Sequence, residues 1–388
     1  MASGYLRSRY VFKSRLKRLL AFFFDLLGSC FVKLARSFKK SQTDFHLDRI
    51  LLIRLDHLGD VVMIKPSIRL LAKKFPGLKI DLLISEEVKP LFQDDPDLHE
   101  IITMKHGWFS NSPPAKILSE SQVILTTLKK NAYNTAIDFR GDLRNIFLMA
   151  LAGIPRRIGY GITGGGFLLT DQGRYQPETH QTGLNQQLLK FLEIDEQIVE
   201  QKPFQYSPER KRLFWNQWSN RFKDIHPRIV IHPGAGYPSK RWQGSKFHEL
   251  ILKILRDEVA QIILIGTENE KTLLPPLTKN SELLVDLRGK TKLEELPILF
   301  DSCDLYLGND SGPAHVAAAQ GIEMIVLFSG TNDSKVWRPW SDKLHLIEEK
   351  VPCSPCESRI CPLQHHDCMN HISVDSVLKL MVNILKTR

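Results

Sequence analysis

The chain has 388 residues, of which 43% are hydrophobic and 25% are charged, and its formal net charge is +10. This length suits two ordinary domains, and the composition is typical of a globular protein rather than a disordered or membrane-embedded chain. Residues 1–40 hold ten Lys/Arg and a single acidic residue, Asp25, which gives +9 and leaves +1 for the remainder of the chain. A body so close to neutral argues against nucleic acid as a partner.

Residues 1–47 form a basic amphipathic leader. Its apolar core runs from Leu19 to Val32, with Asp25 and Gly28 inside it, whereas a membrane-spanning helix needs about 20 apolar residues. A shorter basic helix with aromatic residues favours the surface of a membrane that carries anionic lipid. We therefore expect peripheral attachment to such a surface. The alternatives are a signal peptide, against which Asp25 and the lack of a clear cleavage site argue, and a solvated basic tail.

From residue 48 onward, apolar runs alternate with longer amphipathic segments. A helix is predicted at residues 61–75, and strands are predicted at residues 50–55, 79–84, 101–104 and 135–139. This alternation predicts βαβ units and a parallel sheet with helices on both faces. We place the first domain at residues 48–205, because the pattern fades after about residue 160 in a polar, Gly-rich stretch.

The same pattern restarts after a predicted linker at residues 206–227. Strands are predicted at residues 228–232, 261–266, 284–287, 304–307 and 324–328. The second domain is placed at residues 228–350, and residues 351–388 are a Cys-rich segment followed by a terminal helix. The chain is therefore predicted to be α/β, with two Rossmann-like doubly wound domains that face each other across a cleft. Ligands of such sheets bind beyond the carboxyl ends of the strands.

The first loop with chemical potential is Leu55-Asp56-His57-Leu58-Gly59-Asp60, which follows the first predicted strand. The carboxylate of Asp60 could take a proton from a substrate hydroxyl. Alternatively, Asp60 could be the N-cap of a helix that begins at Val61. His57 is a further candidate for the base, although a lone loop histidine is commonly just solvated.

The second loop runs from His232 to Trp242 and follows the first strand of the second half. Gly234 and its neighbouring glycine expose backbone N–H groups, while Lys240 and Arg241 supply positive charge. Trp242 can fix the loop by packing. This combination suits a diphosphate, and it lacks the Gly-Lys-Ser/Thr ending of a Walker A loop. The alternative is an exposed turn with solvated cations.

The third loop is Asn309-Asp310-Ser311-Gly312-Pro313-Ala314-His315, between an apolar strand and a helix predicted to begin near Gly312. A strand-to-helix corner points free N–H groups and the positive end of the helix dipole at a bound anion, most naturally a phosphate. We expect Asp310 to organise the loop by accepting backbone N–H bonds, and Ser311 and Gly312 to donate to the phosphate. His315 lies one helical turn further on. An ordinary helix cap is the alternative.

Four of the six cysteines lie within 16 residues, with the spacing C-x₂-C-x₄-C-x₆-C: Cys353, Cys356, Cys361 and Cys368. Four thiolates could hold a structural zinc ion, and His365, His366 and His371 add possible ligands. The alternative is a set of reduced packing thiols.

Taken together and in this order, the three loops resemble glycosyltransferase family 9, which contains the ADP-heptose:lipopolysaccharide heptosyltransferases. The resemblance covers about residues 48–385, and the leader at residues 1–40 departs from it. It implies the GT-B fold and transfer of a sugar from a nucleotide donor with inversion, without an obligatory metal. It further implies these roles: Asp60 as base, Lys240 on the donor phosphate, Asp310, Ser311, Gly312 and His315 at the phosphate end, and Glu268 at the nucleoside, with Glu270 as its neighbour.

The function expected from this resemblance is transfer of heptose from ADP-heptose to a lipid-anchored lipopolysaccharide core. The leader agrees with such an acceptor, and we expect a cytoplasmic protein held peripherally on the inner face of the bacterial inner membrane. Two alternatives remain: a sugar-nucleotide epimerase, which would act on the donor without any acceptor, and a non-catalytic membrane-attached protein that binds nucleotide sugars.

Overall fold

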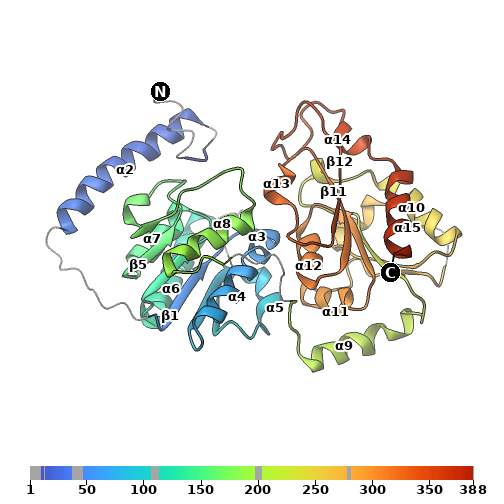
Figure 1. The fold of residues 1–388 in the computed structure, drawn as a ribbon, viewed down its shortest axis with the longest axis horizontal. Helices are drawn as coiled ribbons and strands as arrows, with labels where there is room; N and C mark the ends of the chain where they lie inside the picture. The colour runs from blue at the N-terminus through green and yellow to red at the C-terminus, as the bar shows by residue number, and fades with distance from the viewer. Residues whose placement is uncertain are drawn as a thin grey trace. The chain divides into compact units, whose positions relative to one another are not determined.

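The computed structural model describes residues 10–12, 14–36, 47–105, 113–196, 203–277 and 281–387, with the backbone alone at residues 31–36. The chain divides into two compact units, unit 1 at Met1–Ile198 and unit 2 at Val199–Arg388. Each unit contains one six-stranded sheet, and Figure 1 shows the helices that cover the sheets. Every strand pair in both sheets is parallel, as the alternating pattern predicts.

Unit 1 is built around a sheet with the strand order β3-β2-β1-β4-β5-β6. Its strands are β1 (Arg49–Ile53), β2 (Lys79–Ser85), β3 (Glu100–Met104), β4 (Thr135–Asp138), β5 (Arg156–Gly159) and β6 (Asp171–Gln172). Its helices are α2 (Arg15–Arg36), α3 (Leu58–Val62), α4 (Lys65–Lys74), α5 (Lys89–Phe92), α6 (Pro114–Asn131), α7 (Leu143–Leu151) and α8 (Gln181–Gln187). Strand β1 is buried at four of its five positions, because its apolar run lies at the centre of the sheet.

Unit 2 repeats this architecture with the strand order β12-β11-β10-β7-β8-β9. Its strands are β7 (Arg228–His232), β8 (Gln261–Leu264), β9 (Leu284–Asp286), β10 (Leu305–Asn309), β11 (Glu323–Phe328) and β12 (Leu344–Glu348). Its helices are α9 (Pro208–Trp218), α10 (Gly244–Arg256), α11 (Leu296–Phe300), α12 (Gly312–Gln320), α13 (Ser334–Trp337), α14 (Asp367–Asn370) and α15 (Val374–Lys386). Helix α15 packs its buried residues Val377, Met381 and Ile384 into the core of this unit.

Both sheets therefore have the strand order of a dinucleotide-binding Rossmann domain, in which the first and fourth strands of the unit are neighbours. In unit 1 these strands are β1 and β4, and in unit 2 they are β7 and β10. Chain connections leave these two strands in opposite directions, which opens a crevice at their carboxyl ends where ligands bind. All three loops predicted to carry chemistry begin at one of these strand ends.

Most predicted elements form, with differences at the boundaries. The helix expected at residues 61–75 is two helices, α3 and α4, because Pro66 lies in the first turn of α4. The interval 206–227 was predicted as a linker with a helix at residues 209–223. That helix forms as α9, and the interval is part of unit 2. Three strands were not predicted. Of these, β5 has two arginines in four residues, β6 spans two residues, and β12 is only half-buried along its length.

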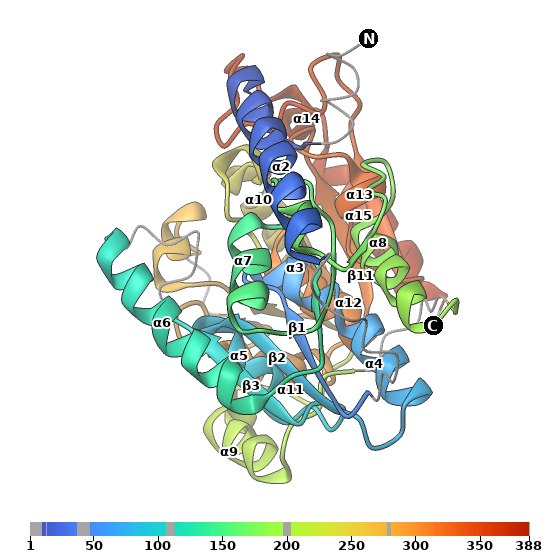
Figure 2. The same cartoon turned by 90° about the vertical axis from the view of Figure 1, so that its left-hand side faces the viewer.

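The leader contributes helix α2, which belongs to unit 1. Figure 2 shows one end of α2 near α7. The ring of Phe24 packs against Phe147 of α7 and against Phe167. None of the described helices is long and apolar enough to cross a membrane. Of the basic leader residues, Arg7, Arg9, Lys13, Lys39 and Lys40 lie outside the described residues.

Candidate active site and donor-binding loops

Asp60 lies in α3, directly beyond the carboxyl end of β1. The helix begins at Leu58 with His57 as its N-cap, and no side chain caps it. The expectation that Asp60 could be an N-cap is therefore wrong, because the helix starts three residues earlier than predicted. The carboxylate instead accepts a hydrogen bond from Nη2 of Arg54, at 3.1 Å. His57 is exposed at the start of the same helix.

Arg54 organises the carboxylates at this edge of unit 1. Its guanidinium is almost fully buried, donates to the backbone oxygen of Phe139 at 2.7 Å and lies 3.4 Å from Asp56. Asp56 also forms an ion pair with Arg140, which comes from the loop after β4. The switch point of unit 1 thus holds two carboxylates and two guanidinium groups, and the sequence analysis did not assign a role to either arginine.

The environment of Asp60 changes its proton affinity. Burial, the largest cause, and the neighbouring Asp56 raise the pKa of Asp60, while Arg54, His57 and Arg140 act in the opposite direction. A carboxylate with a raised pKa is a stronger proton acceptor once it is ionised. The position and chemistry of Asp60 therefore suit a general base.

In unit 2, Lys240 and Asp310 form an ion pair at the carboxyl ends of β7 and β10. The ammonium of Lys240 lies 2.5 Å from Oδ2 of Asp310, and Nε2 of His315 lies 3.8 Å from the other carboxylate oxygen. Asp310 was expected to accept backbone N–H bonds, but its partners are these two side chains. Burial alone would raise the pKa of Asp310, and His315 and Lys240 together lower it below its usual range. Asp310 therefore holds Lys240 in place at the loop.

Ser311 and Gly312 form the corner between β10 and α12. Ser311 is the N-cap residue of α12, but its side chain does not cap the helix, so the ordinary-cap alternative does not account for it. Among the described residues, the backbone N–H groups of Ser311 and Gly312 have no hydrogen-bond partner. The buried Nδ1 of His315 also lacks a hydrogen-bond partner among the described residues. Unpaired donors at a helix N-terminus are suited to an anion.

A buried chain of polar groups runs beneath this corner. Oγ of Ser311 lies 3.1 Å from Nδ1 of His232, and Nε2 of the same ring lies 3.5 Å from the carboxylate of Glu270. Burial alone would raise the pKa of Glu270, but His232 and the backbone N–H of Thr267 lower it to about 2. Glu270 is thus ionised and orients the ring that holds Ser311. In the sequence, His232 stands out only as the first residue of the second loop.

Gly234 has a steric reason to be glycine. A Cβ at this position would lie 1.8 Å from Oε1 of Glu270, so the carboxylate fills the space that a side chain would take. Glu268, which was expected at the nucleoside, is mostly exposed and forms an ion pair with Lys271. Of the two glutamates, Glu270 is the one that lies against the second loop, at Gly234.

Asn309 and Trp242 connect the two loops of unit 2. The side chain of Asn309 accepts from the backbone N–H of Trp242 at 2.9 Å and donates to the backbone oxygen of Pro233 at 2.8 Å. Trp242 is 2% exposed, as its predicted packing role requires. Arg241 donates twice to the backbone oxygen of Ala235 and so closes the loop on itself. These contacts hold the backbone of the second loop in a fixed shape next to the third.

The Cys-rich segment packs against the second loop. The backbone N–H of Ser239 donates to the backbone oxygen of Arg359 at 3.2 Å. Its hydroxyl donates to the backbone oxygen of Ser358 at 2.6 Å. Its backbone oxygen lies 2.8 Å from Nε2 of His366. The segment therefore supports the turn that carries Lys240, a role that the sequence analysis did not assign.

The cysteines of this segment are all unpaired thiols. Burial and the neighbouring cysteines raise the pKa of Cys368. Within the described part of the chain, the only three His, Cys, Asp or Glu side chains with ligand atoms within 4.8 Å of one another are Asp81, His99 and Glu100. The four sulfur atoms therefore do not have the close spacing that a tetrahedral zinc ion requires. Arg49 already pairs with both Asp81 and Glu100.

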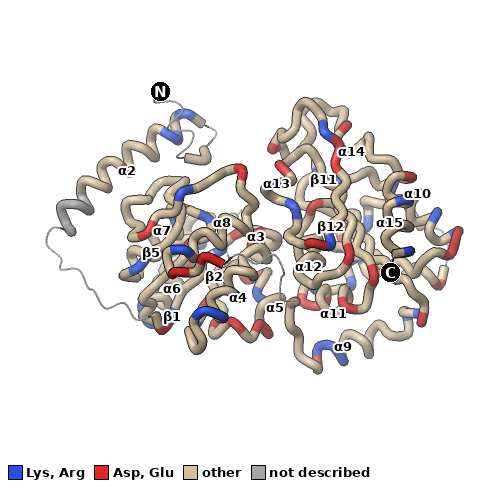
Figure 3. Tube along the Cα trace, in the orientation of Figure 1, with Lys and Arg blue, Asp and Glu red and all other residues tan. Residues whose placement is uncertain are grey.

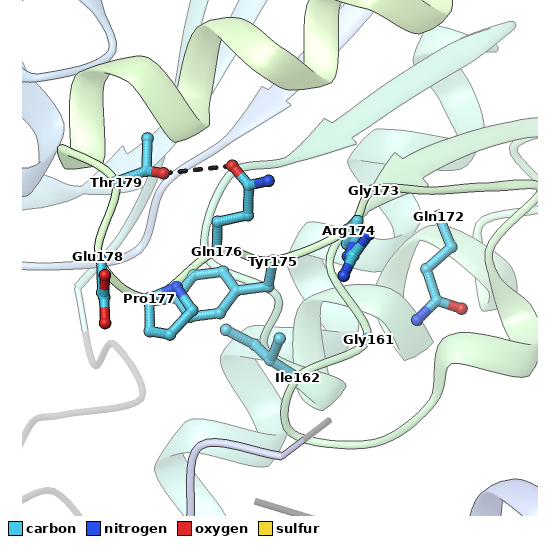
Figure 4. Close-up of a pocket in the computed structure, with 10 residues that line it drawn as sticks. All are labelled: Gly161, Ile162, Gln172, Gly173, Arg174, Tyr175, Gln176, Pro177, Glu178 and Thr179. Atoms are coloured by element: carbon cyan, nitrogen blue, oxygen red, sulfur yellow. Dashed lines mark hydrogen bonds between the residues drawn. The ribbon is translucent and has the colours of Figure 1, made fainter. Parts of the chain in front are cut away.

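A separate pocket of about 810 Å³ lies in unit 1, beyond β5 and β6. Figure 4 shows its lining, which comes from the loop after β5 and the segment after β6: Gly161, Ile162, Gln172, Gly173, Arg174, Tyr175, Gln176, Pro177, Glu178 and Thr179. Arg174 forms no ion pair with a described residue. The lining includes neither Asp60 nor the loops of unit 2, so this pocket is distinct from the groups described above.

Two Rossmann-like units, with a largely buried carboxylate in one and phosphate-type loops in the other, are the arrangement of an enzyme that acts on a nucleotide-bound substrate. Residues 123–366, more than half of the chain, match glycosyltransferase family 9 (heptosyltransferase). The chain belongs to this family and is a glycosyltransferase.

Relatives with known names agree with this assignment. The chain is 24% identical over 337 residues to lipooligosaccharide heptosyltransferase 2 of Campylobacter jejuni, covering 85% of this chain and 96% of that protein. It is similar in structure to Escherichia coli ADP-heptose LPS heptosyltransferase II, with a TM-score of 0.69, 24% identity, and coverage of 87% of this chain and 99% of that one. A family 9 glycosyltransferase from Veillonella parvula is also similar in structure, with a TM-score of 0.78 and 19% identity. The match covers 90% of this chain and 100% of that one. The predicted GT-B fold class is confirmed.

Proposed function

We propose that this glycosyltransferase moves heptose from ADP-heptose to a lipid-anchored lipopolysaccharide core, with inversion at the anomeric carbon. The observation that carries the proposal is the corner between β10 and α12 of unit 2. There Lys240 and the unpaired N–H groups of Ser311 and Gly312 lie together at the switch point of the sheet. The E. coli structure to which the chain is similar is an ADP-heptose LPS heptosyltransferase, which favours this donor and this class of acceptor.

The chemical step is a single displacement. Asp60 accepts the proton of the acceptor hydroxyl while the oxygen attacks the anomeric carbon, and the bond from that carbon to the diphosphate oxygen breaks. Negative charge then grows on the departing ADP. Donors that are already in place at this anion stabilise the transition state more than the ground state, so Lys240, Ser311 and Gly312 accelerate departure. Arg54 keeps the carboxylate of Asp60 oriented.

The nucleotide is proposed to extend from this corner toward β8. His315 serves the phosphate end, and Gly234 and Arg241 shape the loop on which the diphosphate lies. Either Glu268 or Glu270 serves the nucleoside, and the burial of Glu270 against Gly234 favours Glu270. No step in this mechanism uses a metal ion. A structural zinc at Cys353, Cys356, Cys361 and Cys368 stays a prediction that would require these thiols to move closer together.

The site of action is proposed to be the cytoplasmic face of the inner membrane, where a peripheral protein would meet a lipid-anchored acceptor. The basic leader supports this proposal, because Lys and Arg next to an apolar helix favour anionic lipid. A non-catalytic nucleotide-sugar-binding protein would need such a leader as well, but it would not need a buried base.

An ADP-release assay tests the proposed reaction. The purified chain would be given ADP-heptose and a small panel of other nucleotide sugars, each with and without Kdo-lipid A or a heptose-bearing core. Release that requires both ADP-heptose and one of these acceptors is the expected result. Turnover of the donor in the absence of any acceptor would favour an epimerase or a hydrolase and would contradict the proposal.

A further inference from the structure

Helix α2 is fixed to unit 1 by one buried face. Asp25 is 2% exposed and accepts hydrogen bonds from the hydroxyl of Tyr10 at 2.9 Å and from the backbone N–H of Gly165 at 2.6 Å. Gly28 lies on the same face, and a Cβ there would lie 2.3 Å from the ring of Phe167. Directional bonds and close packing therefore set the position of α2 on this loop. The charge inside the apolar core of the leader has a structural role.

The opposite face of α2 carries an exposed apolar stripe. Leu16, Leu20, Phe23 and Leu27 are 65%, 60%, 55% and 71% exposed. Their spacing of four, three and four residues places them in one row along the helix, on the side away from Asp25. Four large apolar side chains in one contiguous row are more than a solvated helix face needs, and such patches mark interaction sites.

The exposed charges in the first turn of α2 are basic. They are Arg15 and Lys17, and Figure 3 shows blue segments at this end of the helix. Arg18 lies on the side of Asp25 and donates to the backbone oxygen of Phe12. The sequence adds Lys33 and Arg36 at the other end of the helix. The single acidic residue among residues 1–40 is Asp25, and it is turned inward. A helix that pairs an exposed apolar stripe with exposed basic residues, and that turns its acidic residue inward, is complementary to a bilayer that contains anionic lipid.

The loop that holds α2 also forms one wall of the unit 1 pocket. Gly161 and Ile162 line the pocket, and the backbone N–H of Val11 donates to the oxygen of Ile162 at 3.1 Å. Gly165 of the same loop is the partner of Asp25. The contacts of Asp25 and Val11 with this loop therefore fix the position of the stripe relative to the pocket that Arg174 lines.

We propose that α2 lies along a bilayer surface, with its stripe of Leu16, Leu20, Phe23 and Leu27 among the lipids. Its attachment to unit 1 through Asp25 then holds the pocket lined by residues 161–162 and 172–179 next to a lipid-anchored, anionic acceptor. The first part stands on the geometry of α2, and the second part rests on the proposed function.

Vesicle binding tests the first part. The full chain is sedimented with vesicles of phosphatidylcholine alone and of phosphatidylcholine with phosphatidylglycerol. The variant L20D/F23D changes two residues of the stripe, and L118D/V123D is its matched control, since Leu118 and Val123 of α6 are similarly exposed at 62% and 64%. We expect binding to the anionic vesicles that weakens with salt. L20D/F23D should weaken it about 100-fold, because each buried large side chain contributes about tenfold. The control should bind like the wild type.

Three results would overturn the membrane assignment. The wild type could fail to bind anionic vesicles, or the two double variants could bind equally well. The third is a wild-type dimer in sedimentation velocity that L20D/F23D converts to a monomer without a change in vesicle binding, which would assign the stripe to a second copy of the chain. Circular dichroism of each variant separates these results from unfolding.

Activity measurements test the second part and separate its failure from that of the proposed function. On a water-soluble acceptor without acyl chains, L20D/F23D should turn over like the wild type, and on vesicle-embedded acceptor it should lose most of its rate. The variant D25A keeps the stripe but frees the helix, so it should bind vesicles and still lose rate on embedded acceptor. Full D25A activity there would refute the coupling. A wild type inactive on both acceptors would refute the proposed function, while the vesicle experiment would still decide the membrane assignment.

Discussion

Oδ1 of Asp60 lies 3.1 Å from Nη2 of Arg54, and both side chains are held at the carboxyl end of β1. This pairing gives the proposed base a fixed orientation and a positive neighbour. It also distinguishes a catalytic carboxylate from a helix cap, because the oxygen that a cap would use for a backbone N–H faces a guanidinium instead.

Replacing Asp60 by Asn should abolish most turnover. The amide keeps the size of the side chain but cannot take a proton, and loss of a positioned base costs about 10²–10⁴ in rate. Single-turnover kinetics with ADP-heptose and acceptor would measure this loss, with donor affinity from calorimetry as the control. We expect unchanged donor affinity, because the donor groups belong to unit 2. A D60N enzyme with near wild-type kcat would exclude Asp60 as the base.

The pH dependence of the reaction should report the pKa of Asp60. Since burial and Asp56 raise this pKa, kcat/KM should rise with pH along a limb that lies above the range of an ordinary aspartate. R54Q removes a positive charge that lowers the pKa, so the limb should move to still higher pH. A profile measured from pH 4.5 to 9 would show this movement. A limb that stays in place in R54Q would mean that Arg54 does not act on the base.

Lys240 should matter for donor binding and for rate together. K240M removes the charge that lies at the phosphate corner and leaves Asp310 without its nearest cation. We expect the Kd of ADP to rise at least about tenfold, in line with a charge-assisted hydrogen bond, and kcat to fall as well. K246M, at a lysine of α10 that binds backbone oxygens near α14, is the control for charge loss in unit 2. Equal ADP affinity in both variants would remove Lys240 from the site.

Glu270 should link stability to acid pH. Its pKa is lowered to about 2 in the folded chain, from an ordinary value of 4.5, so its contribution is complete above pH 4.5 and is lost as the pH falls toward 2. The free energy of unfolding should therefore decline over this range by up to about 3 kcal/mol more in the wild type than in E270Q. Urea unfolding at several pH values measures the difference. Parallel declines would show that the contacts with His232 and Thr267 do not lower the pKa of Glu270 in the folded chain.

Chelation should leave the rate unchanged. The proposed step needs no metal, so EDTA in the ADP-release assay is expected to have no effect, and added Mg²⁺ should not restore any loss. Elemental analysis of the purified chain tests the separate prediction of a structural zinc. A rate that falls with EDTA and returns with one particular ion would require a metal in the mechanism.

The framework of this protein could be predicted from its sequence because its central strands are continuous apolar runs. The runs at β7, β8 and β11 stand out for this reason, and so does the amphipathic period of α15. Strands such as β5 escaped prediction because their side chains are largely polar. Their place in the sheet depends on pairing with a neighbour rather than on their own hydrophobicity.

The candidate site was predicted in position but not in its internal contacts. The three loops lie at the switch points of the sheets, as expected from where glycine and charged residues interrupt the pattern. Which charge pairs with which depends on distances between segments far apart in the chain, as with Lys240 and Asp310 or His232 and Glu270. The pairing of Asp25 with Gly165, 140 residues apart, is a further example that no local pattern reveals.

The decisive measurement is mass spectrometry of the acceptor after incubation with ADP-heptose, for the wild type and for D60N. If the chain is the proposed transferase, the wild type adds one heptose to Kdo-lipid A or to a heptose-bearing core and releases one ADP for each, while D60N adds none on the same time scale. An unmodified acceptor in the presence of a folded wild type that binds ADP-heptose, or equal modification by D60N, would contradict the proposed reaction or its base.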